Sequence, residues 1–337
     1  MSSDTNRPEK ETRFLDHTLR PTLWDDYIGQ ETTKKNLALL LRAAQERNHA
    51  PEHLLFYGPP GLGKTTLAHL IAREIGGNLK TTSGPAIEKI GDLASLLTNL
   101  SSGDVFFIDE IHRLHKTIEE VLYPAMESGV LDIIIGKGPS ARTLQLELPS
   151  FTLVGATTRI ALLSSPLRSR FSGGIFRLEF YTEDEIRRII KRSADILHAD
   201  IDDGACNAIA ARSRATPRTA NYLLKRCRDL AQLEKKSLTR DIAEKTFTLL
   251  AIDPIGLAPA DRKILETLVV KFNGGPVGVN TLAAATAEET ATIEDVYEPF
   301  LLQSGFIERT PRGRVATAHA YKHLGYTVPE DLQQKLL

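Results

Sequence analysis

The sequence has 337 residues and a mass of 37.2 kDa, which suits two or three domains better than a single hydrophobic core. Apolar residues make up 42% and charged residues 25%, which is ordinary globular usage and excludes a disordered, collagen-like or coiled-coil protein. The net charge of −1 gives no overall positive field, so any contact with DNA must come from a local patch.

The polar start of the chain and the lack of a long apolar run predict a cytoplasmic protein without a membrane span. Cys206 and Cys227 have no metal-ligand spacing, and we expect two buried thiols rather than a disulfide.

The first half of the chain alternates short apolar segments with helical patterns, which is typical of an α/β fold. Strands are expected at residues 54–57, 105–108, 151–154 and 175–180. The unbroken apolar run at 105–108 indicates a central strand covered on both faces. We therefore expect a parallel sheet between helices in a large domain over residues 14–181, preceded by a disordered tail over residues 1–13.

A hairpin is expected to interrupt this alternation at residues 131–148, with Gly and Pro in its turn at 136–140. Its second strand places Leu144, Leu146 and Leu148 on one face. That strip either packs on its own domain or forms an exposed surface that a partner covers. The sequence leaves both alternatives open.

After residue 181 the strands stop, and two further domains are expected. Helices at 183–198, 202–212, 217–233 and 239–250 predict a small all-α domain over residues 182–254. A connector with Pro and Gly follows. Helices at 260–271, 279–285 and 293–302, then a hairpin at 306–317, predict a winged helix over residues 255–330.

A phosphate-binding loop is the strongest motif in the sequence. Residues 58–65 read GPPGLGKT, match the pattern GxxxxGK[ST], and stand between an expected strand and an expected helix. Glycines allow backbone N–H groups to turn toward phosphates, Lys64 reaches the β and γ oxygens, and Thr65 supplies a hydroxyl to Mg²⁺. The motif predicts binding of ATP or ADP with Mg²⁺.

Two carboxylates follow the strand at 105–108, and they suggest hydrolysis. Asp109 would hold the metal through water, and Glu110 would orient the water that attacks the γ-phosphate. Thr158, after the next strand, either hydrogen-bonds the γ-phosphate or attacking water or merely caps its loop. Together these residues predict an ATPase.

Two arginines are candidates for contacts with the nucleotide. Arg170 ends a short helix and is either a surface residue or a finger supplied in trans, which requires an oligomer. Arg218 lies in the first turn of the helix at 217–233, where positive charge opposes the helix dipole unless an anion is near. That anion is either a nucleotide phosphate or a neighbouring carboxylate.

The expected wing is locally basic. Residues 306–322 hold four basic residues and one acidic residue, a charge of +3 (4 − 1). Arg309, Arg312 and Arg314 surround its turn, where they suit contacts with DNA phosphates, although solvated turns carry arginines too.

These motifs in this order, together with the segments Leu19-Arg20-Pro21, Tyr27-Ile28-Gly29-Gln30 and Leu178-Glu179-Phe180-Tyr181, closely resemble the RuvB family. Members are AAA+ motors of Holliday junction branch migration. The resemblance implies an AAA+ P-loop domain, a helical lid and a winged helix, assembled as a homo-hexamer on duplex arms at four-way junctions. It implies RuvA as a partner docking on hairpin 131–148, and RuvC as a further partner in a resolving complex.

The resemblance also assigns roles to individual residues. Asp109 and Glu110 would be the Walker B pair, Thr158 sensor 1, Arg170 the trans finger and Arg218 sensor 2. By the same resemblance the wing arginines contact DNA. The adenine pocket would be formed by Leu19, Arg20, Tyr27, Ile28 and Tyr181, and the phosphates would be held by Gly61, Gly63, Lys64, Thr65 and Thr66.

Three other functions fit the sequence less well. A sliding-clamp loader shares the ATPase motifs but lacks a winged helix. An ATP-switched transcription regulator is disfavoured because the third helix of the winged domain is expected to present Glu294, Asp295 and Glu298 to DNA. A protein unfoldase is disfavoured because Lys89-Ile90-Gly91 lacks a pore-loop aromatic residue. Two stretches depart from the family pattern, at residues 127–129 and 171–174, and both bear on the expected subunit contact.

Overall fold

The computed structural model describes residues 18–135 and 142–330, and the chain divides after Tyr181 into two compact units. The expected tail over residues 1–13 and the hairpin turn at 136–140 therefore lie outside the described residues. Within the described ranges, no helix is long and apolar enough to cross a membrane.

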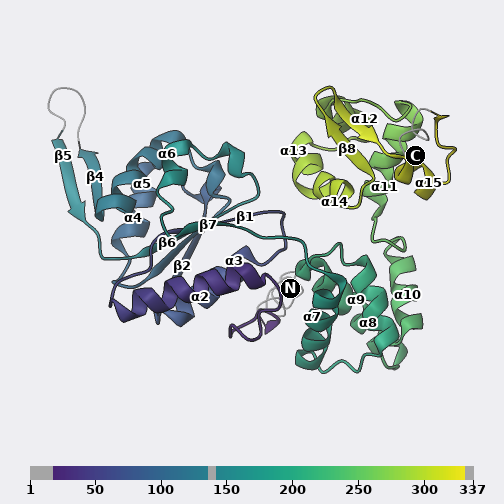
Figure 1. The fold of residues 1–337 in the computed structure, drawn as a ribbon, viewed down its shortest axis with the longest axis horizontal. Helices are drawn as coiled ribbons and strands as arrows, with labels where there is room; N and C mark the ends of the chain where they lie inside the picture. The colour runs from purple at the N-terminus through teal and green to yellow at the C-terminus, as the bar shows by residue number, and fades with distance from the viewer. Residues whose placement is uncertain (1–17, 136–141, 331–337) are drawn as a thin grey trace, which may run out of the picture. The chain divides into compact units, whose positions relative to one another are not determined.

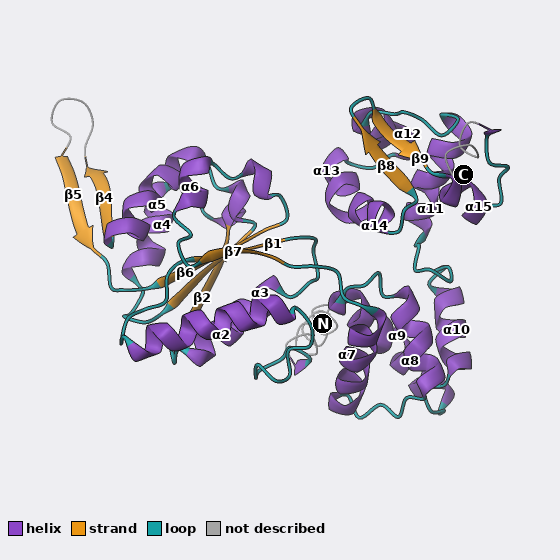
Figure 2. Cartoon of the chain, in the orientation of Figure 1, coloured by secondary structure: helices purple, strands orange, loops and turns teal. Residues whose placement is uncertain are grey.

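The first unit is built on a five-stranded sheet whose neighbouring strands are all parallel, in the order β2-β3-β6-β1-β7. Helices α2 and α3 cover one face, and α4, α5 and α6 cover the other (Figure 1, Figure 2). This confirms the expected α/β class. The strands are β1 (Leu54–Tyr57), β2 (Leu79–Ser83), β3 (Val105–Asp109), β6 (Thr152–Thr157) and β7 (Gly174–Arg177), and the helices are α2 (Glu31–Glu46), α3 (Lys64–Glu74), α4 (Ile90–Thr98), α5 (Lys116–Ser128) and α6 (Ser165–Ser169).

The central strand β3 is buried along its length except at Asp109. Phe106 and Ile108 pack with Leu153 of β6 and with side chains of α4 and α5 in one hydrophobic cluster. Because parallel strands between helices need apolar residues on both faces, this part of the fold was predictable from composition. The edge strand β2 was missed, since the polar residues between Leu79 and Ser83 leave it with no apolar run.

The expected hairpin is present as β4 (Val130–Ile135) and β5 (Arg142–Glu147), which project from the rest of the first unit (Figure 1). Leu131 is fully buried, and Leu146 and Leu148 are partly buried against the core of their own domain. Leu144, opposite Ile133 in the register, is 44% exposed. The apolar strip is thus divided: its base packs on its own domain, and Leu144 remains exposed.

The second unit begins with four helices, α7 (Glu183–Ile196), α8 (Asp203–Arg212), α9 (Pro217–Glu234) and α10 (Arg240–Leu249). Thr182 and Glu185 form a capping box at the start of α7, and the side chains of Asp202 and Thr216 cap α8 and α9. These caps explain why the starts of these helices could be predicted closely from the sequence.

The lid helices also bury both cysteines. Cys206 on α8 and Cys227 on α9 are free and buried, as expected.

The rest of the second unit is a winged helix, but its helices are more broken than expected. The helix expected at 260–271 is α11 (Pro259–Glu266) followed by a π-helical turn (Thr267–Lys271), and the helix expected at 293–302 is α13 (Thr290–Thr292), a second π-helical turn (Ile293–Tyr297) and α14 (Glu298–Gln303). Apolar periodicity does not distinguish these turns from regular helix. The domain also contains α12 (Val279–Thr286), the wing strands β8 (Ile307–Thr310) and β9 (Gly313–Ala316), and an additional α15 (Ala318–His323).

Candidate functional site

The phosphate-binding loop joins β1 to α3 and is closed by Lys64. Gly63 has φ 99° and precedes the first residue of the helix, so the loop turns sharply into the helix N-terminus. The ammonium group of Lys64 donates to the backbone carbonyls of Gly58 at 2.8 Å and Pro59 at 2.9 Å. Its side chain is buried within the loop. A positive charge and a helix N-terminus thus converge where the motif places an anion. Thr65 and Thr66 occupy the first turn of the helix.

Two tyrosines support the loop from the side of the expected adenine pocket. The hydroxyls of Tyr27 and Tyr181 lie 3.3 Å apart, and each donates toward the carbonyl of Leu62, at 3.4 and 3.3 Å. A Cβ atom added to Gly63 would lie 2.9 Å from the Tyr27 hydroxyl. Burial, together with the neighbouring Tyr181, raises the pKa of Tyr27 well above its ordinary value.

The other residues expected in the adenine pocket lie near Tyr27 in the sequence. Leu19 is buried, and Arg20 and Ile28 are partly exposed. Gln30 accepts from the backbone N–H of Glu179 at 3.1 Å and donates to its carbonyl at 2.6 Å. These two bonds fasten the segment after Ile28 to the segment that leads into Tyr181.

The expected catalytic carboxylate and sensor meet at the carboxyl edge of the sheet. Because β3 and β6 are neighbours, Glu110 and Thr158 leave the sheet side by side, and Thr158 Oγ1 donates to Glu110 Oε2 at 3.2 Å. Glu110 has φ 47°, an uncommon value for a residue with a side chain. His112, to which the sequence assigned no role, lies 3.2 Å from the same carboxylate oxygen and 2.8 Å from Thr157 Oγ1. Its position two residues after Glu110 was the available signal.

The chemistry of the donors at this edge fits a magnesium ion. Asp109 ends β3, and one of its oxygens accepts from the backbone N–H of Glu110 at 3.0 Å. The Thr65 hydroxyl and the Asp109 carboxylate are hard oxygen donors, which Mg²⁺ prefers. The described residues contain no group of three or more His, Cys, Asp or Glu side chains that could hold a metal. A metal here would therefore take its remaining ligands from phosphates and water.

Arg170 directly follows α6 and lies against α5. One guanidinium nitrogen is 3.0 Å from Glu127, another donates to the carbonyl of Pro166 at 2.7 Å, and the group lies 4.3 Å from the ring centroid of Tyr123. The Arg170 side chain is 18% exposed. Arg170 is therefore held within its own subunit by an ion pair and a hydrogen bond.

Arg218 lies in the first turn of α9 and is exposed. Among residues 18–135 and 142–330, no carboxylate forms an ion pair with it. Of the two anions that the sequence left open, the described residues thus do not supply a paired carboxylate.

Two of the three wing arginines form ion pairs within their own domain, which their sequence does not suggest. Arg314 is buried, and it donates to Glu298 at 2.9 and 3.1 Å and to Glu294 at 3.1 Å. Arg309 is 54% exposed and donates to Glu298 at 2.9 Å. Arg312, in the turn, is exposed. Arg312 and Arg309 are therefore more accessible to solvent than Arg314.

Glu298 corrects one expectation. It is 1% exposed and is not presented to solvent from the third helix. Burial acts to raise its pKa, but the hydrogen bonds from Arg309 and Arg314 outweigh burial and lower the pKa. The local charge of +3 is therefore reduced by two glutamates that lie outside the wing sequence.

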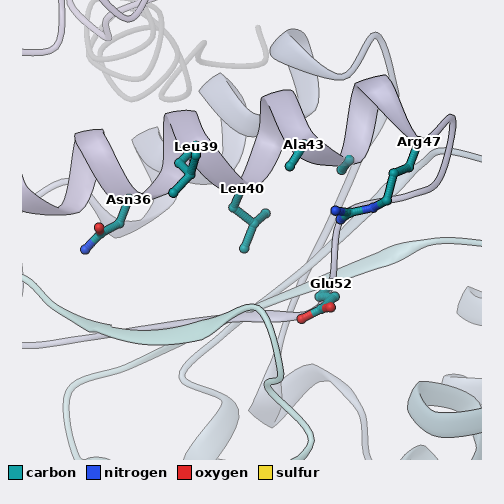
Figure 3. A pocket seen from close by; sticks show the side chains of 7 residues that line it. Asn36, Leu39, Leu40, Ala43, Arg47 and Glu52 are labelled. Carbon is teal, nitrogen blue, oxygen red and sulfur yellow. The ribbon is translucent and has the colours of Figure 1, made fainter.

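A pocket of about 230 Å³ lies beside α2 (Figure 3). One of its residues, Glu52, precedes β1, whereas the phosphate-binding loop follows β1, so the pocket is at the opposite edge of the sheet. The pocket is lined by Asn36, Leu39, Leu40, Ala43, Ala44, Arg47 and Glu52. None of the expected site residues lines it.

Comparison with known proteins decides the family. A family model described as the P-loop domain of the Holliday junction DNA helicase RuvB matches residues 19–178. The RuvB AAA lid domain matches residues 181–253, and the RuvB C-terminal winged helix domain matches residues 254–325. The chain belongs to the RuvB family.

RuvB proteins from several organisms match almost the whole chain. The Holliday junction branch migration complex subunit RuvB of Dehalococcoides mccartyi is 57% identical over 318 residues, covering 94% of this chain and 91% of that protein. The subunit of the same name from Thermomicrobium roseum is 57% identical over 329 residues, covering 97% and 93%. The solved structure of the Thermotoga maritima RuvB Holliday junction branch migration motor is 52% identical, has a TM-score of 0.85, and covers 93% of this chain and 100% of its own. The RuvB fold therefore extends through all three domains.

Proposed function

We propose that the protein is an ATP-driven DNA motor that promotes branch migration of Holliday junctions during homologous recombination, DNA repair and the SOS response. The reaction is ATP + H₂O to ADP + phosphate. The observation that carries the proposal is the meeting of Glu110 and Thr158 at the sheet edge that bears the phosphate-binding loop. It occurs in a chain similar to proteins named as branch migration subunits.

The proposed hydrolysis uses Lys64, Glu110 and Thr158, of which the last two are already hydrogen-bonded to each other. Lys64 holds the β and γ phosphate oxygens, and Glu110 accepts a hydrogen bond from the attacking water and polarises it. Thr158, bonded to the Glu110 carboxylate at 3.2 Å, fixes the direction of that carboxylate and contacts the water or the γ-phosphate. Mg²⁺, held by Thr65 and through water by Asp109, would neutralise phosphate charge.

The proposed assembly is a homo-hexameric ring in which Arg170 of one subunit reaches the nucleotide of the next. Its 18% exposure and its ion pair with exposed Glu127 support this role, since the guanidinium can exchange one anion for another. Arg218 would contact the phosphates as sensor 2, because it lies at a helix N-terminus and forms no ion pair with a carboxylate of the described residues.

The proposed partners are duplex DNA at four-way junctions, RuvA and, in a resolving complex, RuvC. Arg309 and Arg312 are the wing residues best exposed to contact phosphates, with Arg314 behind them. RuvA would dock on the hairpin 131–148, where Leu144 is exposed beyond the packed base of the apolar strip.

The deciding experiment is strand exchange on a synthetic four-way junction with Mg²⁺, ATP and RuvA. We expect movement of the junction that requires hydrolysis. Clamp loading or operator binding without movement of the junction would contradict the assignment as a motor.

A second experiment tests the role of Arg170 in trans. Arg170→Ala should bind ATP without hydrolysing it, and mixing it with Glu110→Gln protein should restore some turnover. Failure of every mixture, with ring assembly intact, would count against that role.

A further inference from the structure

The lid helices and the winged helix are fastened by two arginines from the end of α8 and the loop after it. Arg212 donates to the backbone carbonyl of Asp253 at 3.1 Å and pairs with Glu244 at 2.9 Å. Arg214 donates to the carbonyl of Gly256 at 2.9 Å. Both carbonyls belong to the connector that leads from α10 to α11.

The connector lies directly against this loop. Gly256 has φ 91°, and a Cβ atom at this position would lie 2.6 Å from the carbonyl oxygen of Arg212. From the other side, Asp253 accepts from the backbone N–H of Leu257 at 2.8 Å and pairs with His323 of the winged helix at 2.7 Å. A segment that looks like a linker in the sequence is therefore held at both ends.

A further contact is the ion pair between Arg214 and Asp261, the third residue of α11. The Asp261 side chain is 0% exposed and the Arg214 side chain 18%. Asp261 also accepts from the backbone N–H of Ala258 at 2.8 Å, and the guanidinium lies 5.1 Å from the ring centroid of Phe300. Burial raises the pKa of Asp261, and the charge of Arg214 opposes this change. The Arg214 guanidinium thus links the lid to both α11 and α14 of the winged domain.

The same loop leads directly into the candidate sensor. Arg214 and Ala215 have φ 53° and 52°, and two successive left-handed residues with side chains are uncommon. Thr216 then caps α9, and Arg218 lies in its first turn. The ion pair is therefore attached, through a sharply turned loop, to the helix end that carries Arg218.

We propose that Arg214 is a positioning residue: by pairing with Asp261 it holds the loop before Arg218 to α11, so that α9 and the winged helix turn as one body. Contact between Arg218 and a nucleotide phosphate would then be transmitted to the DNA-binding wing. This inference rests on the proposed function, because it needs a nucleotide at Arg218.

The first test compares Arg214→Ala, Asp261→Asn and the double variant of the full chain with Arg226→Ala. Arg226 is a matched control because its ion pair with Asp229 lies within α9. We expect Arg214→Ala, Asp261→Asn and the double variant to bind a fluorescent ADP analogue as tightly as the wild type. Their DNA-stimulated ATP turnover should fall about tenfold. The double variant should be no worse than the worse single variant, since both remove one contact. Arg226→Ala should keep the wild-type response.

The second test measures the rigid connection itself. Spin labels at Leu249→Cys on the lid and Val270→Cys on the winged helix use side chains that are 74% and 55% exposed, while Cys206 and Cys227 are buried. We expect one narrow distance distribution in the wild-type background and a broad one with Arg214→Ala. If Arg214→Ala fails to fold, Arg214→Lys keeps the charge without the planar fork and should broaden the distribution less.

Each outcome decides the question. A narrow distribution and full DNA stimulation in Arg214→Ala would overturn the inference, as would equal losses in Arg226→Ala. If the wild-type protein hydrolyses ATP but never moves a junction, that result would instead contradict the proposed function. The two failures are therefore distinguishable.

Discussion

Replacing Arg314 by alanine should damage the stability of the winged helix more than its affinity for DNA. The change would remove two of the three hydrogen bonds that Glu298 accepts from arginines and leave a carboxylate that is 1% exposed. Breaking one partner out of a buried ion pair costs about 3–5 kcal/mol. Because Arg309 still bonds Glu298, we take the lower end, about 3 kcal/mol, which lowers Tm by roughly 12–24 °C for a domain of 60–100 residues.

The effect should depend on pH in a defined direction. The pKa of Glu298 is lowered in the folded protein, so its contribution to the free energy of unfolding is present above the ordinary glutamate pKa. That contribution is lost as pH falls through the lowered value. The difference in Tm between wild type and Arg314→Ala should therefore be largest near neutral pH and shrink in acid, as followed by thermal melts across the acidic range.

Arg312→Ala is the matched control, because Arg312 is exposed in the same turn. It should keep the wild-type Tm, weaken DNA binding, and reduce the slope of log K against log salt by about 0.9. If Arg314→Ala instead keeps the wild-type Tm at neutral pH and loses DNA affinity with a smaller salt slope, Arg314 contacts phosphate directly, and the structural role assigned to it is wrong.

Three further predictions concern the first unit and the lid. Glu110→Gln should bind ATP with near wild-type affinity and hydrolyse it at least about a hundredfold more slowly, because the positioned acceptor for water is lost; equal turnover in a phosphate-release assay would refute its role. Gly63→Ala should weaken nucleotide binding, because the new Cβ would lie 2.9 Å from the Tyr27 hydroxyl at φ 99°; isothermal titration with ADP would measure the loss, and unchanged affinity would argue against the role of the loop shape. Burial raises the pKa of Cys227 to about 12 and also raises that of Cys206, so a thiol reagent at pH 8 should label neither until the protein is unfolded, and rapid labelling of the native protein would contradict their burial.

The sequence predicted those parts of the site that depend on neighbours along the chain. The loop ending in Lys64 and the pair Asp109-Glu110 each follow a short apolar strand, and such strands are readily recognised. Glu110 and Thr158 are 48 residues apart, and their meeting was predictable for a different reason, because both follow the carboxyl ends of parallel strands.

The sequence could not predict contacts that join distant residues of unremarkable type. Glu298 was expected on a solvated helix face, yet the structure buries it under two arginines that lie 11 and 16 residues further along. Arg214 and Asp261 are 47 residues apart, and neither belongs to a motif. Periodicity describes which face of an element is apolar, but it does not say which charged residue fits a gap between elements.

The arginine–glutamate network in the wing has a consequence for motion. Each phosphate contact with duplex DNA releases about one condensed counterion, so affinity rises steeply with the number of free cationic groups. In this wing Arg314 is paired inside the domain, and Arg309 is shared with Glu298. Few free cationic groups are therefore left for the DNA phosphates, and we expect the wing to bind DNA weakly. Weakly held phosphates are released quickly, and rapid release would let a DNA motor advance without stalling at each contact.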